Sequence, residues 1–451
     1  MDFFSSNHLD GEALCQHLDD NDELSSVANS FHFPSSHDNK KAIYLCGNSL
    51  GLQPKAAKEH VLEHMDKWAS MGVEGHFTEP EPWLTIDDVV QESMARLVGA
   101  LPDEVVMMNS LTCNLHLMMN AFYHPTVSRH KILIEKKAFP SDYHAAISQI
   151  LHHKYSPKTS LVEIEPREGE VILHHEDIER AIDLEGDSIA LVLFSGVQYY
   201  TGQLFNMERI TRAARARGCI VGFDLAHAVG NVPLQLHEWG CDFACWCSYK
   251  YLNCGPGSIG GCFVHDRHGS RQLIMSTESS SDTPIEAAGD DPACASDGRL
   301  AGWWGHRLSD RFDMSPTFVS CRGAYGYRLS NPPVLLVACA KASLDLFDKI
   351  GIDKIRRKSE LLTGYLEHLI KKDLNNFISI FTPSTPQERG CQLSLAFKNT
   401  DLEEVFAFLQ QHGVVCDIRK PDVMRIAPVP LYNSFRDVYT FVEILKKRLT
   451  T

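Results

Sequence analysis

The chain has 451 residues, of which 44% are hydrophobic and 22% charged, values typical of a globular protein with two or three domains. The formal net charge of -15 disfavours nucleic acid or an anionic membrane as the main partner, because both reward a basic surface. The N-terminal segment MDFFSSNHLDGEAL has no basic region, sustained apolar stretch or arginine, so it predicts neither a secretory signal nor a mitochondrial presequence. No apolar run approaches the roughly 20 residues of a membrane helix. The 14 irregularly spaced cysteines indicate a reduced, cytoplasmic protein.

Residues 1 to about 40 predict a polar lead-in with a short helix near Glu12, and regular structure is expected from Ala42. Between about 60 and 270, short apolar runs alternate with helical periodicity. This pattern predicts an α/β fold with a mostly parallel sheet and helices on both faces. Asn206 is expected to cap one helix, and Gly218 to end it. The predicted strands are Val105 to Met108, Lys131 to Glu135, Ile189 to Phe194, Cys219 to Asp224, Phe243 to Ser248 and Gly260 to Val264.

The character of the chain changes at 274–300, which is rich in Ser, Asp, Ala and Pro and has no periodicity. Such a stretch predicts a long flexible loop, and loops of this length in a compact enzyme are usually lids or disordered insertions. The elements expected after it are a long helix that follows Asn331-Pro332-Pro333 and runs to about Ile350, a second helix, a strand Gln392 to Phe397, a helix Asp401 to His412, strands near Val414 and Met424, and a final helix from Ser434.

These elements predict three parts. Residues 1–60 form an N-terminal segment that joins the small domain. Residues 61–330 form the large domain, with 274–300 as a flexible insertion. Residues 331–451 form a smaller α+β domain.

Asp224 closes one predicted buried strand and Lys250 follows another, at the strand ends where ligands bind in open α/β sheets. A lysine held against apolar neighbours loses hydration, so its amine is more easily deprotonated. A neutral amine forms a Schiff base with an aldehyde, and a nearby carboxylate holds a pyridinium nitrogen protonated. That pair is what pyridoxal phosphate (PLP) requires. The alternatives are a solvated lysine and a helix-capping aspartate.

Ser110 and Thr112 stand at the start of a predicted apolar helix, where free backbone N–H groups and the helix dipole favour a phosphate. Plain N-capping is the alternative. Phe139 follows a strand and can stack on a pyridine ring, and Asp142 can accept a hydrogen bond nearby; an ordinary turn remains possible.

Ser195 places a hydroxyl at the end of a third strand. Arg425, on a strand of the small domain, is suited to fork onto a substrate carboxylate, although domain packing is an alternative role. Four cysteines between 241 and 254 lack zinc-site spacing and are interpreted as buried thiols, so no metal site is predicted.

Long runs of the chain resemble the kynureninase family of PLP-dependent hydrolases, which has the type I aminotransferase-like fold. The resemblance covers nearly everything from Ala42 onward. It rests on the runs GNSLGL at 47, NSLTCNLHL at 109, FPSD at 139, LFSGVQYYTGQ at 193, VGFDLAHAVGN at 221, DFACWCSYKYLN at 242, LSNPP at 329 and RIAPVPLYNS at 425.

The resemblance implies hydrolytic Cβ–Cγ cleavage of L-kynurenine or L-3-hydroxykynurenine to an anthranilate and L-alanine, in tryptophan catabolism and NAD biosynthesis. It implies pyridoxal 5'-phosphate in a Schiff base on Lys250, with Asp224 at the pyridinium nitrogen and Tyr249 as a proton relay. The implied cofactor residues are Leu111, Thr112, Phe139, Pro140, Ser141, Asp142, Ser195, Asp224, His227, Tyr249, Lys250, Trp303 and Asn331. The implied substrate residues are His76, Ser330, Asn331 and Arg425.

Trp303 and Asn331 are implied to reach the site across a homodimer interface, with no nucleic acid or membrane as partner. One departure from the family is 274–300, which resembles an insertion and is expected to be an innocuous surface loop, since loop insertions cost little. Three rival functions remain. They are another PLP reaction such as transamination or desulfuration, a cofactor-binding homologue without activity, and a nucleotide-binding domain; the last is disfavoured because no GxGxxG follows a strand.

Overall fold

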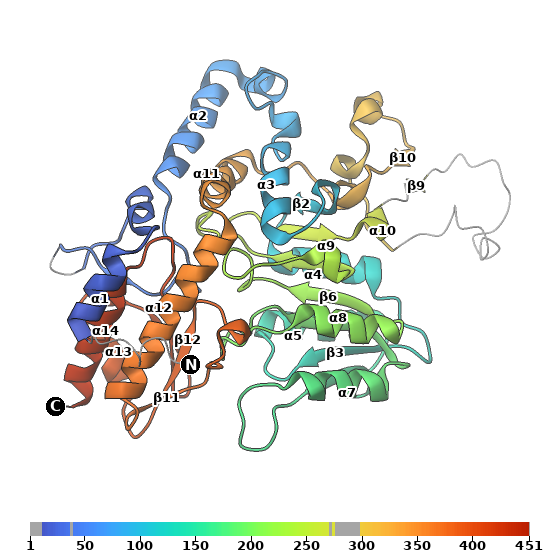
Figure 1. Cartoon of the computed structure of the whole chain (residues 1–451). Helices are drawn as coiled ribbons and strands as arrows, with labels where there is room; N and C mark the ends of the chain where they lie inside the picture. The colour runs from blue at the N-terminus through green and yellow to red at the C-terminus, as the bar shows by residue number, and fades with distance from the viewer. Residues whose placement is uncertain (1–10, 37–38, 270–272, 276–297, 451) are drawn as a thin grey trace.

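The computed structural model describes residues 11–36, 39–269, 273–275 and 298–450. Figure 1 shows a large helix-covered sheet and, beside it, a smaller α+β unit that contains both ends of the described chain. Of the helices in the described ranges, none has both the length and the apolar character needed to cross a membrane.

The large sheet has seven strands in the order β2-β8-β7-β6-β5-β3-β4. Five neighbouring strands, β7, β6, β5, β3 and β4, run parallel, while β8 is antiparallel to both β7 and β2. The predicted α/β architecture with a mostly parallel sheet is therefore confirmed. The strand bounds are β2 (Val105–Met107), β3 (Lys131–Glu135), β4 (Leu161–Ile164), β5 (Ile189–Ser195), β6 (Ile220–Asp224), β7 (Phe243–Trp246) and β8 (Gly261–Val264).

The central strands read as continuous apolar runs because both faces of the sheet are covered. Along β5, Val192 and Phe194 face one hydrophobic cluster while Leu191 and Leu193 face another. Each fully buried side chain of this kind contributes about 1.5–3 kcal/mol. The first cluster includes residues of α3 (Asp88–Val98), α7 (His175–Glu185) and α8 (Met207–Ala216), and the second includes residues of α4 (Leu111–Phe122) and α5 (Pro140–His152).

Helix α8 has the predicted cap, since the side chain of Asn206 accepts a hydrogen bond from the backbone of Arg209. Gly218 follows the helix with φ +70°, a conformation that a residue with a Cβ rarely adopts. The chain then enters β6 directly. The Asn206 cap and Gly218 therefore mark the two ends of α8, and the strand that ends at Asp224 follows it directly.

The small unit has a four-stranded antiparallel sheet in the order β11-β12-β15-β14. The N-terminal helix α1 (Gly11–Asp20) packs against α14 of this unit, and β1 pairs in parallel with β13. The three-part domain division stays a prediction. The bounds are β1 (Ile43–Tyr44), α12 (Ile352–Asp373), β11 (Ile378–Ile380), β12 (Leu393–Phe397), α13 (Leu402–Gln411), β13 (Val414–Val415), β14 (Asp417–Arg419), β15 (Val423–Ile426) and α14 (Phe435–Leu449).

Helix α2 (Lys55–Met71) packs against α11 (Val334–Ile350) and projects from the body of the molecule (Figure 1). Ile274 and Met275, the first two residues of the predicted loop 274–300, instead form β9 (Ile274–Met275), which pairs with β10 (Phe318–Val319). The rest of that loop, 276–297, lies outside the described residues. The short helices are η1 (Ser25–Ser30), η2 (Gly72–His76), η3 (Trp83–Thr85), η4 (Pro102–Glu104), α6 (Pro157–Ser160), α9 (Leu236–Trp239), α10 (Asp266–Gly269), η6 (Trp303–Gly305), η7 (Leu308–Asp313), η8 (Gly323–Tyr327) and η9 (Pro386–Glu388).

Candidate cofactor and active site

A cavity opens at the carboxyl ends of the parallel strands, where ligands bind in this architecture. Ser195 ends β5, Asp224 ends β6, and Lys250 follows β7 by four residues. The cavity also receives the first residues of α4 and α5. The lining residues are Ser110, Leu111, Thr112, Glu135, Phe139, Ser141, Ser195, Val197, Tyr199, Asp224, Ala226, His227, Tyr249 and Lys250.

Lys250 lies between two aromatic rings at the cavity wall. Its Nζ is 5.8 Å from the ring centre of Phe139 and 5.9 Å from that of Tyr249. Within the described part of the chain, no hydrogen bond or ion pair engages this amine. A half-buried amine without such a partner is free to react with an aldehyde in the cavity.

Three buried carboxyl groups lie in or next to this space, and two of them, Asp224 and Glu135, line the cavity. Asp224 accepts a hydrogen bond from the backbone of Ala226 at 2.7 Å, which fixes its orientation. Burial, and next the charge of Asp224, raises the pKa of Asp142 well above its usual value. Burial also raises the pKa of Glu135 to about 7, against a hydrogen bond from Ser195 Oγ at 2.6 Å that lowers it. Protonation of Asp142, and of about half of the Glu135 carboxyls at pH 7, thus limits the negative charge around Asp224.

His227 is fully buried beside Lys250. Burial, and then the lysine charge, lowers its pKa well below the usual value for histidine. The imidazole therefore stays neutral at physiological pH, and one ring nitrogen remains able to accept a hydrogen bond.

The N-terminus of α4 faces the cavity through Ser110, Leu111 and Thr112. The side chain of Ser110 makes no capping hydrogen bond, so plain N-capping does not explain it. Thr112 Oγ1 lies 2.7 Å from the hydroxyl of Ser141, in the first turn of α5, which places two hydroxyl groups beside the free amides. Such a helix terminus is suited to a phosphate group.

The donor set fits PLP. The α4 terminus suits the phosphate, Phe139 offers a ring face, and Lys250 offers a reactive amine. Asp142 does not itself line the cavity, and its Oδ1 is buried without a hydrogen-bond partner beside Asp224. The segment Pro140–Asp142 forms the first turn of α5, so the alternative of an ordinary turn is wrong.

Arg425, on β15, is buried at the edge of the site. Its guanidinium donates to Asp417 Oδ1 at 2.7 Å, to Ser49 Oγ at 3.0 Å and to the carbonyl of Tyr199 at 2.9 Å. Because Tyr199 lines the cavity, Arg425 is one residue removed from it. A substrate carboxylate would have to share this cation with Asp417.

The remaining residues implied by the resemblance do not line the cavity of this single chain. Pro140, Ser330 and Asn331 are exposed, and His76 is half-buried against Trp83, with ring centres 5.4 Å apart. The side chain of Trp303 is 46% exposed and donates to the carbonyl of Arg311.

Three residues at the site were absent from the sequence prediction. Glu135 ends β3, and a polar residue at a strand end was a usable signal for it. Tyr199, whose ring packs edge-on to Phe139 at 5.2 Å, lies in a loop with no such signal. Asp417 was hidden because its partner, Arg425, belongs to a neighbouring strand.

Comparisons with known proteins agree with this geometry. The family model Kynureninase C-terminal domain matches residues 355–445, and the model Aminotransferase class-V matches residues 43–278. Solved structures share the fold at low identity. A cysteine desulfurase of Escherichia coli superposes with a TM-score of 0.70 at 16% identity, covering 95% of this chain and 98% of that one. A cystine C–S lyase gives a TM-score of 0.69 at 13% identity, with 90% and 97% covered.

Curated relatives match over nearly the whole chain. A kynureninase of Myxococcus xanthus is 48% identical, with 97% of each chain covered. A kynureninase of Mus musculus is also 48% identical, over 96% of this chain and 92% of the relative. A kynureninase of Xanthomonas campestris is 50% identical over 94% and 95%. With this identity over full length, and with a cavity suited to PLP, the chain belongs to the kynureninase family.

Proposed function

We propose that the protein hydrolyses L-kynurenine and L-3-hydroxykynurenine, with PLP as its cofactor, to anthranilate or 3-hydroxyanthranilate and L-alanine. The observation that carries the proposal is the convergence of Lys250, Asp224 and the N-terminus of α4 on one cavity, in a chain 48–50% identical to kynureninases. This reaction belongs to tryptophan catabolism and supplies NAD biosynthesis.

Bound PLP supplies an electron-accepting ring that stabilises negative charge on the carbons next to the substrate amine. Lys250 would hold the cofactor covalently, Phe139 would pack on its ring, and Thr112 with the α4 amides would hold its phosphate. Leu111, Ser141 and Ser195 complete this wall of the cavity. Asp224 would keep the ring nitrogen protonated, and Asp142, kept protonated by burial, would orient Asp224.

The half-buried amine of Lys250, once released by the substrate, is the base best placed to move the α-proton. Neutral His227 lies beside it and would accept a hydrogen bond rather than add a positive charge. The two groups therefore have different roles. Lys250 moves the proton, and His227 orients what is bound.

Tyr249 is suited to donate a proton near the γ-carbonyl of the substrate. Burial raises the pKa of its hydroxyl, so the hydroxyl keeps its proton at physiological pH. A protonated phenol can donate a hydrogen bond to the oxygen on which charge develops when water adds to that carbonyl.

Arg425 would bind the α-carboxylate of the substrate. The guanidinium already points between Asp417 and the carbonyl of Tyr199, so it is held in a fixed orientation. His76, Ser330 and Asn331 would line the aryl pocket, and Trp303 with Asn331 would contribute from the second subunit.

A homodimer is proposed because exposed apolar side chains gather where these distant residues lie. Trp68 on α2 is 62% exposed, Phe77 is 59% exposed and Phe312 is 47% exposed. Phe312 contacts both Phe77 and Trp303, with ring centres 6.3 and 5.5 Å apart. An apolar surface of this kind is typical of a protein interface.

A cytoplasmic location is also proposed. Each cysteine in the described part of the chain is a free thiol, and most are buried. Free thiols are typical of a reducing compartment. Fractionation of cells that express the protein would test this directly, and recovery with a secreted or organellar fraction would refute it.

The decisive test is turnover of both L-kynurenine and L-3-hydroxykynurenine by PLP-loaded protein, with alanine and the anthranilate measured together. Alanine and the anthranilate are expected in equal amounts. The ratio of kcat/KM for L-3-hydroxykynurenine to kcat/KM for L-kynurenine identifies the preferred substrate. Absence of either product from a protein that binds PLP would refute the proposed function. Release of persulfide from cysteine would instead support the rival desulfuration.

A further inference from the structure

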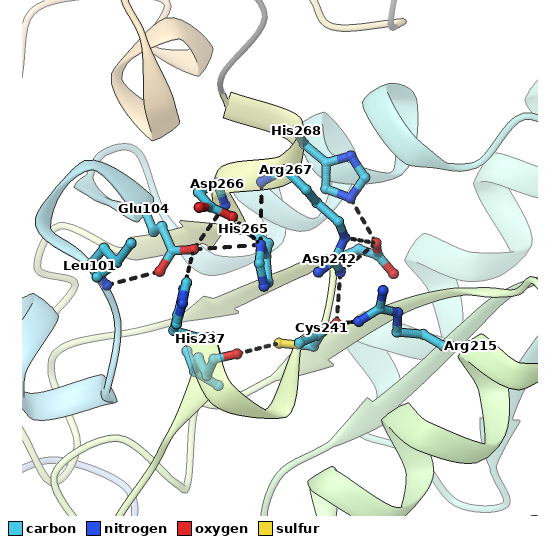
Figure 2. Close-up of polar contacts among 12 residues, drawn as sticks. Leu101, Glu104, Arg215, His237, Cys241, Asp242, His265, Asp266, Arg267 and His268 are labelled. Atoms are coloured by element: carbon cyan, nitrogen blue, oxygen red, sulfur yellow. Dashed lines mark hydrogen bonds and ion pairs between the residues drawn. The ribbon is translucent and has the colours of Figure 1, made fainter.

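Four potential metal ligands gather at the end of the large sheet opposite the cavity. Glu104 directly precedes β2, His265 and Asp266 directly follow β8, and His237 lies on α9, before β7. Figure 2 shows the side chains of Glu104, His237 and His265 converging on one point. Three segments that are distant in the sequence therefore meet here.

The ligand atoms are close enough to share one ion. His237 Nδ1 lies 2.9 Å from Glu104 Oε1, and His265 Nδ1 lies 3.6 Å from the same oxygen. His265 Nδ1 is also 2.8 Å from Asp266 Oδ1. All four atoms lie within 4.8 Å of one another. Ligands about 2.0–2.2 Å from a tetrahedral zinc ion are separated by about 3.4 Å, so small side-chain rotations suffice.

Glu104 is a fully buried carboxylate whose partners are backbone N–H groups and histidines, which is an unusual environment for a buried negative charge. Its oxygens accept from the backbone N–H groups of Leu101 and Asp266, both at 2.8 Å. Among the residues that the structure describes, no lysine or arginine pairs with it, and its ion-pair partners are the two histidines. Glu104 therefore lacks a permanent positive partner.

The neighbouring buried carboxylate provides the contrast. Asp242 is paired with Arg267 at 2.8 Å and with His268 at 2.7 Å (Figure 2). A buried charge is normally paired in this way or bound to a metal. Asp242 is paired with basic side chains, whereas the side chains around Glu104 are arranged so that they could bind a metal ion.

We propose that Glu104, His237, His265 and Asp266 bind a divalent transition-metal ion of the zinc type. Two imidazole nitrogens and two carboxylate oxygens, one of them from the exposed Asp266, provide four donors of the kinds that zinc accepts. Without the metal, His237 Nδ1 is hydrogen-bonded to Glu104 Oε1, and His265 Nδ1 accepts from the backbone N–H of Arg267 at 3.3 Å, a bond that the ion would replace. With it, one ion joins the ends of β2 and β8 to α9.

The site is separate from the reaction chemistry. The parallel strands direct their carboxyl ends to Lys250, and the cluster lies at their amino ends. Metal binding is thus expected to change stability and to leave kcat at moderate temperature unchanged.

The first measurement is cobalt binding by PLP-loaded protein that has been dialysed against a chelator. One equivalent of Co²⁺ is expected to give the visible absorption of a tetrahedral site, and one equivalent of zinc to abolish it. A cobalt–thiolate band would place the ion on a cysteine and overturn the proposal, as would the absence of a zinc-displaceable spectrum. This result requires no variant and therefore does not depend on the folding of one.

The second measurement is thermal unfolding with and without zinc. At a zinc concentration a hundred times the dissociation constant, the wild-type Tm is expected to rise by about 3 °C. His265→Gln and His237→Gln should each lose both this shift and the cobalt spectrum. The matched control, His268→Gln, removes an adjacent imidazole that binds Asp242 and should retain both. An equal zinc shift in all four proteins would overturn the proposal.

Discussion

Replacing Glu135 by glutamine should stabilise the protein at alkaline pH and have little effect in acid. Glu135 is buried at the end of β3, where its carboxyl accepts a hydrogen bond from Ser195. Burial is the largest of the causes that raise its pKa from 4.5 to about 7. Glutamine keeps the size of the side chain and an acceptor for Ser195 but does not ionise.

The sign follows from proton binding. Between pH 4.5 and about 7, folded Glu135 retains a proton that the unfolded chain has released, so the free energy of unfolding falls as pH rises. The destabilisation is absent below pH 4.5 and complete above pH 7. A shift from 4.5 to about 7, at 1.36 kcal/mol per pKa unit, corresponds to a cost of about 3 kcal/mol.

The assay is urea unfolding of cofactor-free wild-type and Glu135→Gln protein at several pH values between 4.5 and 8. The stability difference in favour of the variant should grow by up to about 3 kcal/mol across this range. Glu163→Gln, on the neighbouring strand β4 and partly accessible to solvent, is the control for removing a carboxylate as such. A difference that is constant with pH, or that grows toward acid, would refute the reasoning.

Three further predictions concern the reaction. Lys250→Ala should abolish turnover of kynurenine and the covalent retention of PLP, measured by product formation and by denaturing gel filtration after borohydride reduction of the Schiff base; retained turnover would contradict the assignment. Arg425→Lys keeps the positive charge but loses the two parallel hydrogen bonds that a guanidinium makes to a carboxylate. The value of kcat/KM should therefore fall by about 10–100-fold, mainly through a higher KM. An unchanged KM would exclude Arg425 from substrate binding. Mixing refolded Lys250→Ala and Asn331→Ala subunits should restore about one quarter of wild-type activity, because half of the random dimers contain one intact site; no recovery would indicate that Asn331 acts within its own subunit.

Much of the fold could be predicted because its central strands are buried on both faces. The runs that became β5 and β6 are almost uninterrupted apolar segments, and their existence and approximate bounds were correct. The antiparallel return of β8 was not predictable, because an apolar run carries no information about its direction in a sheet. Strand β4 was missed since three of its four residues are only partly buried.

In the candidate site, too, residues with a local sequence signal could be predicted, whereas residues whose partners are distant in the sequence could not. Asp224 and Lys250 were identifiable because a charged residue after an apolar run is conspicuous. The Glu104, His237 and His265 cluster had no such signal, since its members come from three segments with no short spacing between them. Where a partner comes from a distant strand, only the folded chain shows the pair. The domain division stays a prediction, and the mixing of Lys250→Ala and Asn331→Ala subunits tests the dimer.

The parallel pair between β1 and β13 has a consequence for biosynthesis. Ile43 pairs with Val414, about 370 residues further along the chain. At a synthesis rate of 5–20 residues per second, β1 therefore waits roughly 20–70 s for its partner after it leaves the ribosome. During that time the N-terminal segment is an unpaired strand edge, open to chaperones and to neighbouring nascent chains. Strand β13 is translated only after about nine tenths of the 451 residues, so even a late nonsense mutation, shortly before codon 414, would leave β1 unpaired.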